Sequence, residues 1–520
     1  ILNRQAMASH TFVTGSTGTG KSNAVYHLLD EITKDGRTSF LVVEPAKGEY
    51  KNVFGSRADV KVFGTNPRET PLLRINPFAF PQNIHILEHI DRLVEIFNAC
   101  WPMYAAMPAV LKDAIERSYQ KVGWDLRNSE SEKGVFPTFF DLLDILPGVI
   151  EESHYSKDTQ SDYVGALCTR VKSLTNGIYG SVFCAEDALS DAELFDCNVV
   201  VDLSRVGSME TKSLLMGILV MKLQEYRMCG SEMNSRLRHV TVLEEAHNLL
   251  RKTSAEQPQE GANLQGKSVE MLANAIAEMR TYGEGFIIAD QAPGLLDMSV
   301  IRNTNTKIIL RLPDEEDRKL VGKSAALKEA QIDELSKLPL GVAAVYQNEW
   351  PEAVLCKIEA YPMPENAVYH KPSKMPHEIN AEFVFGQLAA GKELEPLSVS
   401  EMEQLKRWLK RHEMMLKPED GRYLEQVFAG GELDVAKTRK AVFDFFGGIS
   451  TVVDYCAAAE KSFTPRKEFL EQLQGQYGLK AAAADWVLNS VISMGMSLNP
   501  DAKAVDNLRT NFEQQGGRVL

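Results

Sequence analysis

Residues 10–22, HTFVTGSTGTGKS, decide the fold of this chain. The apolar run 10–14 predicts a strand, and the following run 22–32 predicts a helix. Between them, residues 15–22 match the pattern G-x-x-x-x-G-K-[ST]. A glycine-rich turn in this place lets backbone N–H groups surround a phosphate at the start of a helix. The segment therefore predicts a nucleotide-binding α/β domain.

The side chains of this turn predict both a nucleotide and a metal ion. Lys21 would reach the β- and γ-phosphates of ATP, and the Ser22 hydroxyl would hold Mg²⁺. The residues expected to bind the nucleotide are Gly15, Thr17, Gly18, Thr19, Gly20, Lys21 and Ser22.

Five further strands are expected after the turn. The runs are 39–44, 197–203, 239–244, 285–291 and 307–312. They are apolar almost throughout and alternate with helical stretches, which is typical of parallel strands covered by helices on both faces. The predicted fold is a doubly wound, parallel α/β sheet.

Two of these runs end in candidate catalytic residues. Glu244 and Glu245 close the run 240–245, VTVLEE. Hydrolysis needs one acidic group for Mg²⁺, here Glu244, and one that orients the attacking water, here Glu245. Gln291 ends the run 286–291 and is placed to sense the γ-phosphate.

Arg280 has two interpretations that the residues alone leave open. It ends a helix in which Leu272, Ile276 and Met279 recur with helical spacing, so its charge would favour the helix C-terminal dipole. It would equally serve as an arginine finger that reaches the γ-phosphate of a neighbouring subunit. Arg311, at the end of the last strand, is a weaker candidate for the same role.

The remaining regions predict additions to the sheet. About 150 residues separate the second and third strands, too long for a connection, and predict an inserted helical subdomain with helices at 86–100 and 109–121. Segments 341–346 and 353–358 predict a hairpin, and the proline-rich stretch 361–378 a linker. Helices are then expected at 401–415, 433–446 and 464–477.

Composition excludes several classes of protein. The chain has 520 residues, 44% of them hydrophobic, and a formal net charge of −14. Its acidic excess lies mainly in residues 1–370, which argues against DNA binding by an open basic face. Seven scattered cysteines form no C-x-x-C pair, which argues against a disulfide framework and a zinc site. No apolar run approaches the roughly 20 residues of a membrane span. We expect a cytoplasmic protein without a membrane partner.

Six motifs in order resemble the HerA/FtsK superfamily of P-loop ATPases, specifically the HerA branch. They are VTGSTGTGKS (13–22), FLVVEPAKGEY (40–50), NVVVDLS (198–204), VTVLEEAHNLL (240–250), RTYGEGFIIADQAP (280–293) and NTKIILRLPDEEDRKLVG (305–322). The resemblance implies a RecA-like core, a homo-hexameric ring with ATP sites between subunits, duplex DNA in the channel, and a nuclease or other effector as partner. It also implies that Glu245 is the catalytic glutamate, Gln291 the sensor and Arg280 the finger.

The expected domains follow from these patterns. Residues 1–67 and 190–360 would form the RecA-like core, 68–189 the inserted subdomain, 361–378 the linker and 379–520 a helical C-terminal region. The N-terminal β-barrel of the HerA branch is expected to precede residue 1. Glu44 and Glu244 stand where the family often has Asp.

Three functions remain open at this point. The first is an ATP-driven translocase of duplex DNA that serves DNA processing or anti-phage defence with an effector. The second is an ATP-responsive ring scaffold that regulates an effector enzyme, which the acidic charge favours. The third is a conjugation-type secretion ATPase, suggested by the NPF stretch at 76–78.

Two basic segments could contact DNA or be ordinary surface. The polar stretch 251–267, with Arg251, Lys252 and Lys267, would form either a DNA-facing channel loop or a surface loop. The cluster of Lys406, Arg407, Lys410 and Arg411 is expected to be a solvated helix face.

Overall fold

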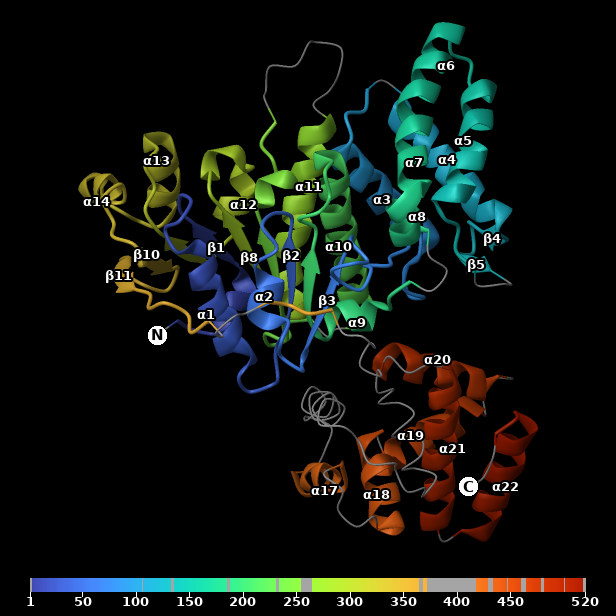
Figure 1. Ribbon diagram of the computed structural model, residues 1–520. Coiled ribbons are helices and arrows are strands. Elements are labelled where there is room, and N and C mark those ends of the chain that lie inside the picture. The colour runs from blue at the N-terminus through green and yellow to red at the C-terminus, as the bar shows by residue number, and fades with distance from the viewer. Residues whose placement is uncertain are drawn as a thin grey trace. The chain divides into compact units, whose positions relative to one another are not determined.

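The computed structural model divides the chain into two compact units, Ile1–Lys371 and Pro372–Leu520 (Figure 1). It describes residues 2–371 and 418–517, apart from stretches at 105, 132–134, 185–187, 231–232, 254–263, 364–367, 429–433, 447, 460–463, 478–480 and 500. The expected helix at 401–415 and its basic cluster lie outside the described residues, as does most of the polar stretch 251–267.

A nine-stranded sheet forms the centre of the first unit, in the order β11-β10-β9-β1-β8-β7-β2-β6-β3. The seven strands from β9 to β3 are parallel, and β10 and β11 complete the sheet as an antiparallel pair. The strands are β1 (Thr11–Thr14), β2 (Ser39–Glu44), β3 (Val60–Gly64), β6 (Asn198–Asp202), β7 (His239–Glu244), β8 (Glu284–Asp290), β9 (Thr306–Ile309), β10 (Val342–Gln347) and β11 (Val354–Lys357).

Alternate residues of the central strands pack into two separate apolar clusters. In β2, Leu41 and Val43 join the cluster on one face, while Phe40 and Val42 join the cluster on the other. Side chains of a strand point alternately to opposite faces, so a strand that is apolar throughout needs cover on both. The α/β fold predicted from these runs is thereby confirmed.

Helices supply this cover, and α10 (Met209–Gly230) contributes the largest number of buried residues, thirteen. It packs against α3 (Ile86–Cys100), which also contacts α11 (Leu264–Glu278), so the helices of 68–189 share one apolar cluster with the sheet. The opposite face packs against α1 (Lys21–Thr33) and α2 (Tyr50–Phe54). The other helices of this unit are α4 (Met107–Lys121), α5 (Phe139–Glu152), α6 (Lys157–Tyr163), α7 (Thr169–Thr175), α8 (Gly177–Phe183), α9 (Asp191–Phe195), α12 (Met298–Arg302), α13 (Glu315–Ser324) and α14 (Glu329–Glu334).

Of the strands at the two edges of the sheet, one edge was predicted from the sequence and the other was not. The predicted hairpin is present as β10 and β11. The edge strand β3 was not among the predicted strands, because it is only five residues long and its first two residues, Val60 and Lys61, are partly exposed. The apolar pattern that marks the central strands is therefore weak in β3.

The second unit is helical in its described residues. Its helices are α17 (Pro418–Phe428), α18 (Val435–Phe445), α19 (Gly448–Ala459), α20 (Pro465–Tyr477), α21 (Ala481–Leu498) and α22 (Ala502–Gln514). They enclose their own apolar cluster, which includes Phe445, Tyr455 and Ile492. Within the described part of the chain, no single helix is long and apolar enough to span a membrane; the bent pair Ala436–Phe445 and Gly448–Ala459 passes on length and composition alone.

Candidate nucleotide-binding and catalytic site

The glycine-rich turn joins the end of β1 to the start of α1, and its backbone demands glycine at three positions. Gly18 and Gly20 have φ angles of 76° and 103°, which side chains other than glycine rarely adopt. Gly15 is restricted by space, since a Cβ atom there would lie 2.7 Å from Thr19 Oγ1 and 2.8 Å from Leu310 Cβ. These glycines shape a tight loop that leads directly into the start of α1.

Neighbouring strands hold this loop in place. The Arg311 carbonyl oxygen accepts hydrogen bonds from the Ser16 backbone N–H (3.0 Å) and the Ser16 hydroxyl (3.1 Å). The Thr19 carbonyl accepts one from the Gly341 N–H. Within the described residues, no side chain caps the N-terminus of α1 and no acidic residue lies in its first turn. The start of this helix is thus left open to an anion.

Two predicted site residues, Lys21 and Gln291, converge on the carboxylate of a third, Glu245. Lys21 Nζ lies 3.4 Å from Glu245 Oε1, and the Gln291 amide donates a hydrogen bond to the same oxygen at 2.5 Å. The Gln291 carbonyl oxygen in turn accepts a hydrogen bond from the Thr17 hydroxyl. The structure therefore links the phosphate loop, the end of β7 and the end of β8 through Glu245.

Glu245 follows β7 in a backbone conformation that costs energy. Its φ is 46° and its ψ is 50°, the left-handed region, which costs a residue other than glycine about 1–3 kcal/mol. The turn then continues as the short helix η3 (Ala246–Asn248). The sharp bend directs Glu245 toward the phosphate loop, whereas the preceding Glu244 remains aligned with the sheet.

Glu244 is buried beside a second carboxyl group. It accepts a hydrogen bond from the Tyr50 hydroxyl at 2.5 Å, and burial raises its pKa. Burial also raises the pKa of Glu44 to about 8, although that side chain accepts hydrogen bonds from the backbone N–H groups of Glu49 and Tyr50. These two buried carboxyl groups offer oxygen donors to a divalent cation, and a bound cation would favour their ionised form.

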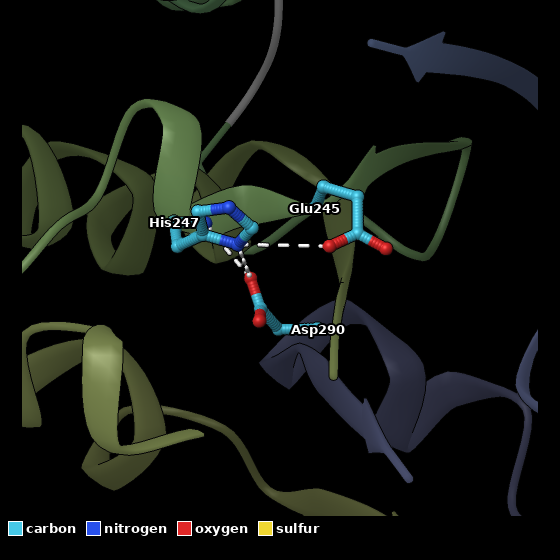
Figure 2. Close-up of side chains that lie close together, drawn as sticks. All are labelled: Glu245, His247 and Asp290. Carbon is cyan, nitrogen blue, oxygen red and sulfur yellow. Dashed lines mark hydrogen bonds and ion pairs between the residues drawn. The ribbon is translucent and has the colours of Figure 1, made fainter. Parts of the chain in front are cut away.

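His247 and Asp290 complete the cluster, and neither was among the predicted site residues (Figure 2). Asp290 Oδ2 lies 2.9 Å from His247 Nδ1, which is itself 3.6 Å from Glu245 Oε2. The hydrogen bond to Asp290 raises the pKa of His247. The available signal was their position, because each lies within two residues of a predicted site residue at the end of a strand.

The structure does not bring Arg280 to this cluster within one chain. Arg280 lies in η4 (Met279–Tyr282), which precedes β8, whereas Gln291 follows that strand. The seven residues of β8 place the two ends about 20 Å apart. At its own end, Arg280 is exposed and close enough to His10 to help lower the pKa of that side chain. Arg311, by contrast, is exposed beside the phosphate loop.

Part of the polar stretch after the acidic pair is helical. Helix α11 begins at Leu264, so Lys267 belongs to a helix, whereas a loop was expected at this position. Arg251 forms an isolated bridge with Leu296, and the Lys252 N–H donates to the Leu295 carbonyl.

Comparison with known sequences agrees with this geometry. A family model described as the central domain of the helicase HerA matches residues 2–179. A probable helicase of Methanocaldococcus jannaschii is 23% identical over 390 residues, which are 69% of this chain and 68% of that protein. The DNA double-strand break repair helicase HerA of Sulfolobus acidocaldarius is 25% identical over 367 residues, 68% of this chain and 66% of that protein. The chain thus spans about two thirds of the length of these relatives.

Solved structures share the fold. VirB4 of Thermoanaerobacter pseudethanolicus aligns with a TM-score of 0.52 at 20% identity, over 68% of this chain and 90% of that one. The plasmid coupling protein TrwB, in complex with a non-hydrolysable ATP analogue, aligns with a TM-score of 0.50 at 14% identity, over 71% and 90% of the two chains. At these identities the likeness extends to the fold alone.

Proposed function

We propose that this chain, a HerA-like P-loop ATPase, hydrolyses ATP with Mg²⁺ and uses the energy to move along duplex DNA. The observation that carries the proposal is the convergence of Lys21 and Gln291 on the Glu245 carboxylate beside the phosphate loop. The match to the HerA family model and the relatives described as helicases support DNA as the substrate of the motor.

The residues of the loop would bind the phosphates of ATP. The N–H groups of the loop and the open start of α1 attract the phosphate charge, and Lys21 would neutralise it. When ATP draws Lys21 away from Glu245, that carboxylate becomes free to orient the attacking water and accept its proton. Gln291, which contacts both Glu245 and Thr17, would report the presence of the γ-phosphate to the end of β8.

The buried carboxyl groups fit a magnesium ion. We propose that the Ser22 hydroxyl and the Glu244 carboxylate hold it, since oxygen donors suit this ion and a bound cation would offset the cost of ionising the buried Glu244. Bound Mg²⁺ would neutralise charge on the phosphate oxygens. Solved nucleotide complexes of TrwB support a nucleotide at this fold, and nothing beyond that.

The active form in this proposal is a homo-hexameric ring. Arg280 would then contact the nucleotide of a neighbouring subunit, since within its own chain it lies at the other end of β8. Duplex DNA would pass through the channel, and a nuclease or other effector protein would act on it in DNA processing or defence against phage.

The test is ATP hydrolysis by the purified chain with and without linear duplex DNA. We expect DNA to stimulate phosphate release several-fold. Lys21→Ala should abolish nucleotide binding, while Glu245→Gln should lower the turnover number by about 10²–10⁴ and leave binding intact. Binding is followed with a fluorescent ATP analogue.

The controls separate the alternatives. Hydrolysis that is lost in both variants but is indifferent to DNA would contradict the translocase and favour the ATP-responsive scaffold, which the acidic charge of the chain also supports. A conjugation-type secretion role finds no specific support, because the likeness to VirB4 and TrwB concerns the fold alone.

A further inference from the structure

Two consecutive residues at the end of β8 hold the turn that follows β7 from two sides. Gln291 donates a hydrogen bond to the side chain of Glu245. Asp290, its neighbour, accepts one from the backbone N–H of His247 at 2.8 Å. The turn is therefore held by the end of the adjacent strand at two positions, the side chain of Glu245 and the backbone of His247.

Asp290 also fixes the imidazole of His247. Its Oδ2 atom lies 2.9 Å from Nδ1, and because a carboxylate oxygen accepts, Nδ1 carries the proton. Asp290 is fully buried, and its other oxygen accepts a hydrogen bond from the Ala292 N–H. The carboxylate is thus anchored within the protein, and the ring that it holds cannot turn without breaking a hydrogen bond.

The held ring faces Glu245. Nδ1 lies 3.6 Å from Glu245 Oε2 (Figure 2). Gln291 and Lys21 contact the other oxygen, Oε1, whereas Oε2 lies within ion-pair distance of the Nδ1 atom that donates to Asp290. Lys21 belongs to the phosphate loop, and Gln291 contacts Thr17 in it. His247 is instead held by Asp290 at the end of β8, so we expect ATP binding to leave His247 in place.

We propose that His247, held by Asp290, is a positioning residue that fixes the orientation of the Glu245 carboxylate during ATP hydrolysis. The inference rests on the proposed function, because it assigns a role through Glu245. The left-handed backbone of Glu245 adds to the need for such support, since a strained residue keeps its conformation only when its surroundings impose it. A cation shared by the three side chains is disfavoured, because Asp290 Oδ2 already accepts two N–H groups.

The experiment compares His247→Ala and His247→Asn in the full chain with saturating duplex DNA. We expect His247→Ala to lower the turnover number about tenfold or more, with KM for ATP within about threefold of the wild-type value. Asn places an amide N–H near the position of Nδ1, so His247→Asn should recover part of the activity.

The matched control is His239, which forms the same kind of pair at the other end of the same two strands. Its Nδ1 lies 2.7 Å from Glu284 Oε1, and both side chains are buried. His239→Asn should leave the turnover number of the folded protein close to that of the wild type, whatever it does to stability. A fall equal to that of His247→Asn would indicate a general loss of structure and overturn the proposal.

A second background tests the route through Glu245. In Glu245→Gln protein, adding His247→Ala should change the residual single-turnover rate by less than about twofold, because residues that act as a unit are not additive. An equal fall in both backgrounds, or wild-type turnover in His247→Ala alone, would overturn the positioning role. If instead the wild type does not hydrolyse ATP, or Glu245→Gln remains fully active, the proposed function itself fails.

Discussion

At the scale of single residues, Gly15 makes the sharpest prediction about the phosphate loop. Its missing Cβ leaves the space in which Thr19 and Leu310 pack. Gly15→Ala should shift the loop and weaken ATP binding about tenfold, equivalent to about 1.4 kcal/mol. Titration with a fluorescent ATP analogue measures the effect. The control is Gly207→Ala, where no described atom lies within 4 Å of the new methyl group, and which should bind as the wild type does.

His10 predicts how stability depends on pH. Burial lowers its pKa from the ordinary value of 6.5 to about 4. The unfolded chain therefore takes up a proton first, so stability is lost as pH falls from about 6.5 to about 4, by about 2 kcal/mol between pH 7 and pH 5. His10→Asn should reduce this loss by that amount, as measured by urea unfolding at the two pH values. An unchanged difference would show that His10 does not titrate as proposed.

The sequence identified site residues whose chemistry is encoded locally. Lys21, Glu245 and Gln291 lie beside the phosphate loop or at strand ends, and parallel strands bring their carboxyl ends to one edge. Their contacts were therefore predictable, while their catalytic roles stay predictions. His247 and Asp290 were missed because their pairing depends on the register of β7 against β8, which no local pattern specifies.

At the scale of elements, glycines in two helices make opposite predictions. In α10, a Cβ atom at Gly217 would lie 2.8 Å from Ile96 Cγ2 of α3, so the two helices approach closely there. In α5, a Cβ atom at Gly148 would have no described neighbour within 4 Å. Gly217→Ala should destabilise the protein by about 1–2 kcal/mol through overpacking, and Gly148→Ala should stabilise it by about 0.5–1 kcal/mol through helix propensity.

Chemical denaturation of the two variants provides the measurement. Because both variants replace glycine by alanine in a helix, the gain in helix propensity is similar in both. The difference between their free energies of unfolding therefore reports the packing at position 217. Equal changes in the free energy of unfolding would mean that α3 and α10 do not depend on the small residue at position 217.

Elements were predictable wherever their apolar period is long. Helix α3 occupies the predicted residues: its buried positions recur with helical spacing from Ile86 to Phe97, and ten of its fifteen residues are buried. Edge strand β3 lacked such a signal, and the helices of 68–189 give no sign in sequence that they would share an apolar cluster with the sheet. Tertiary packing, which these patterns do not encode, decides both features.

At the scale of the whole molecule, the two ends of the parallel sheet carry different parts of the proposed machinery. The carboxyl ends carry Lys21 and Glu245, and the amino end of β8 is preceded by Arg280. A head-to-tail ring joins unlike surfaces of neighbouring subunits, so it is the kind of assembly in which these two ends can meet. An open basic face is not required for DNA in such a ring, which agrees with the net charge of −14.

Mixing of variant subunits tests this arrangement. Lys21→Ala and Arg280→Ala should each lack DNA-stimulated hydrolysis when assembled alone. In an equal, random mixture, about a quarter of the interfaces would pair an intact Lys21 of one subunit with an intact Arg280 of the next, so about a quarter of wild-type activity should return. Phosphate release after dissociation and reassembly measures it, with each variant reassembled alone as the control. If Arg280→Ala alone hydrolyses ATP at the wild-type rate, Arg280 takes no part in hydrolysis. If the mixture stays inactive although mixed assemblies form, Arg280 does not act on a neighbouring subunit.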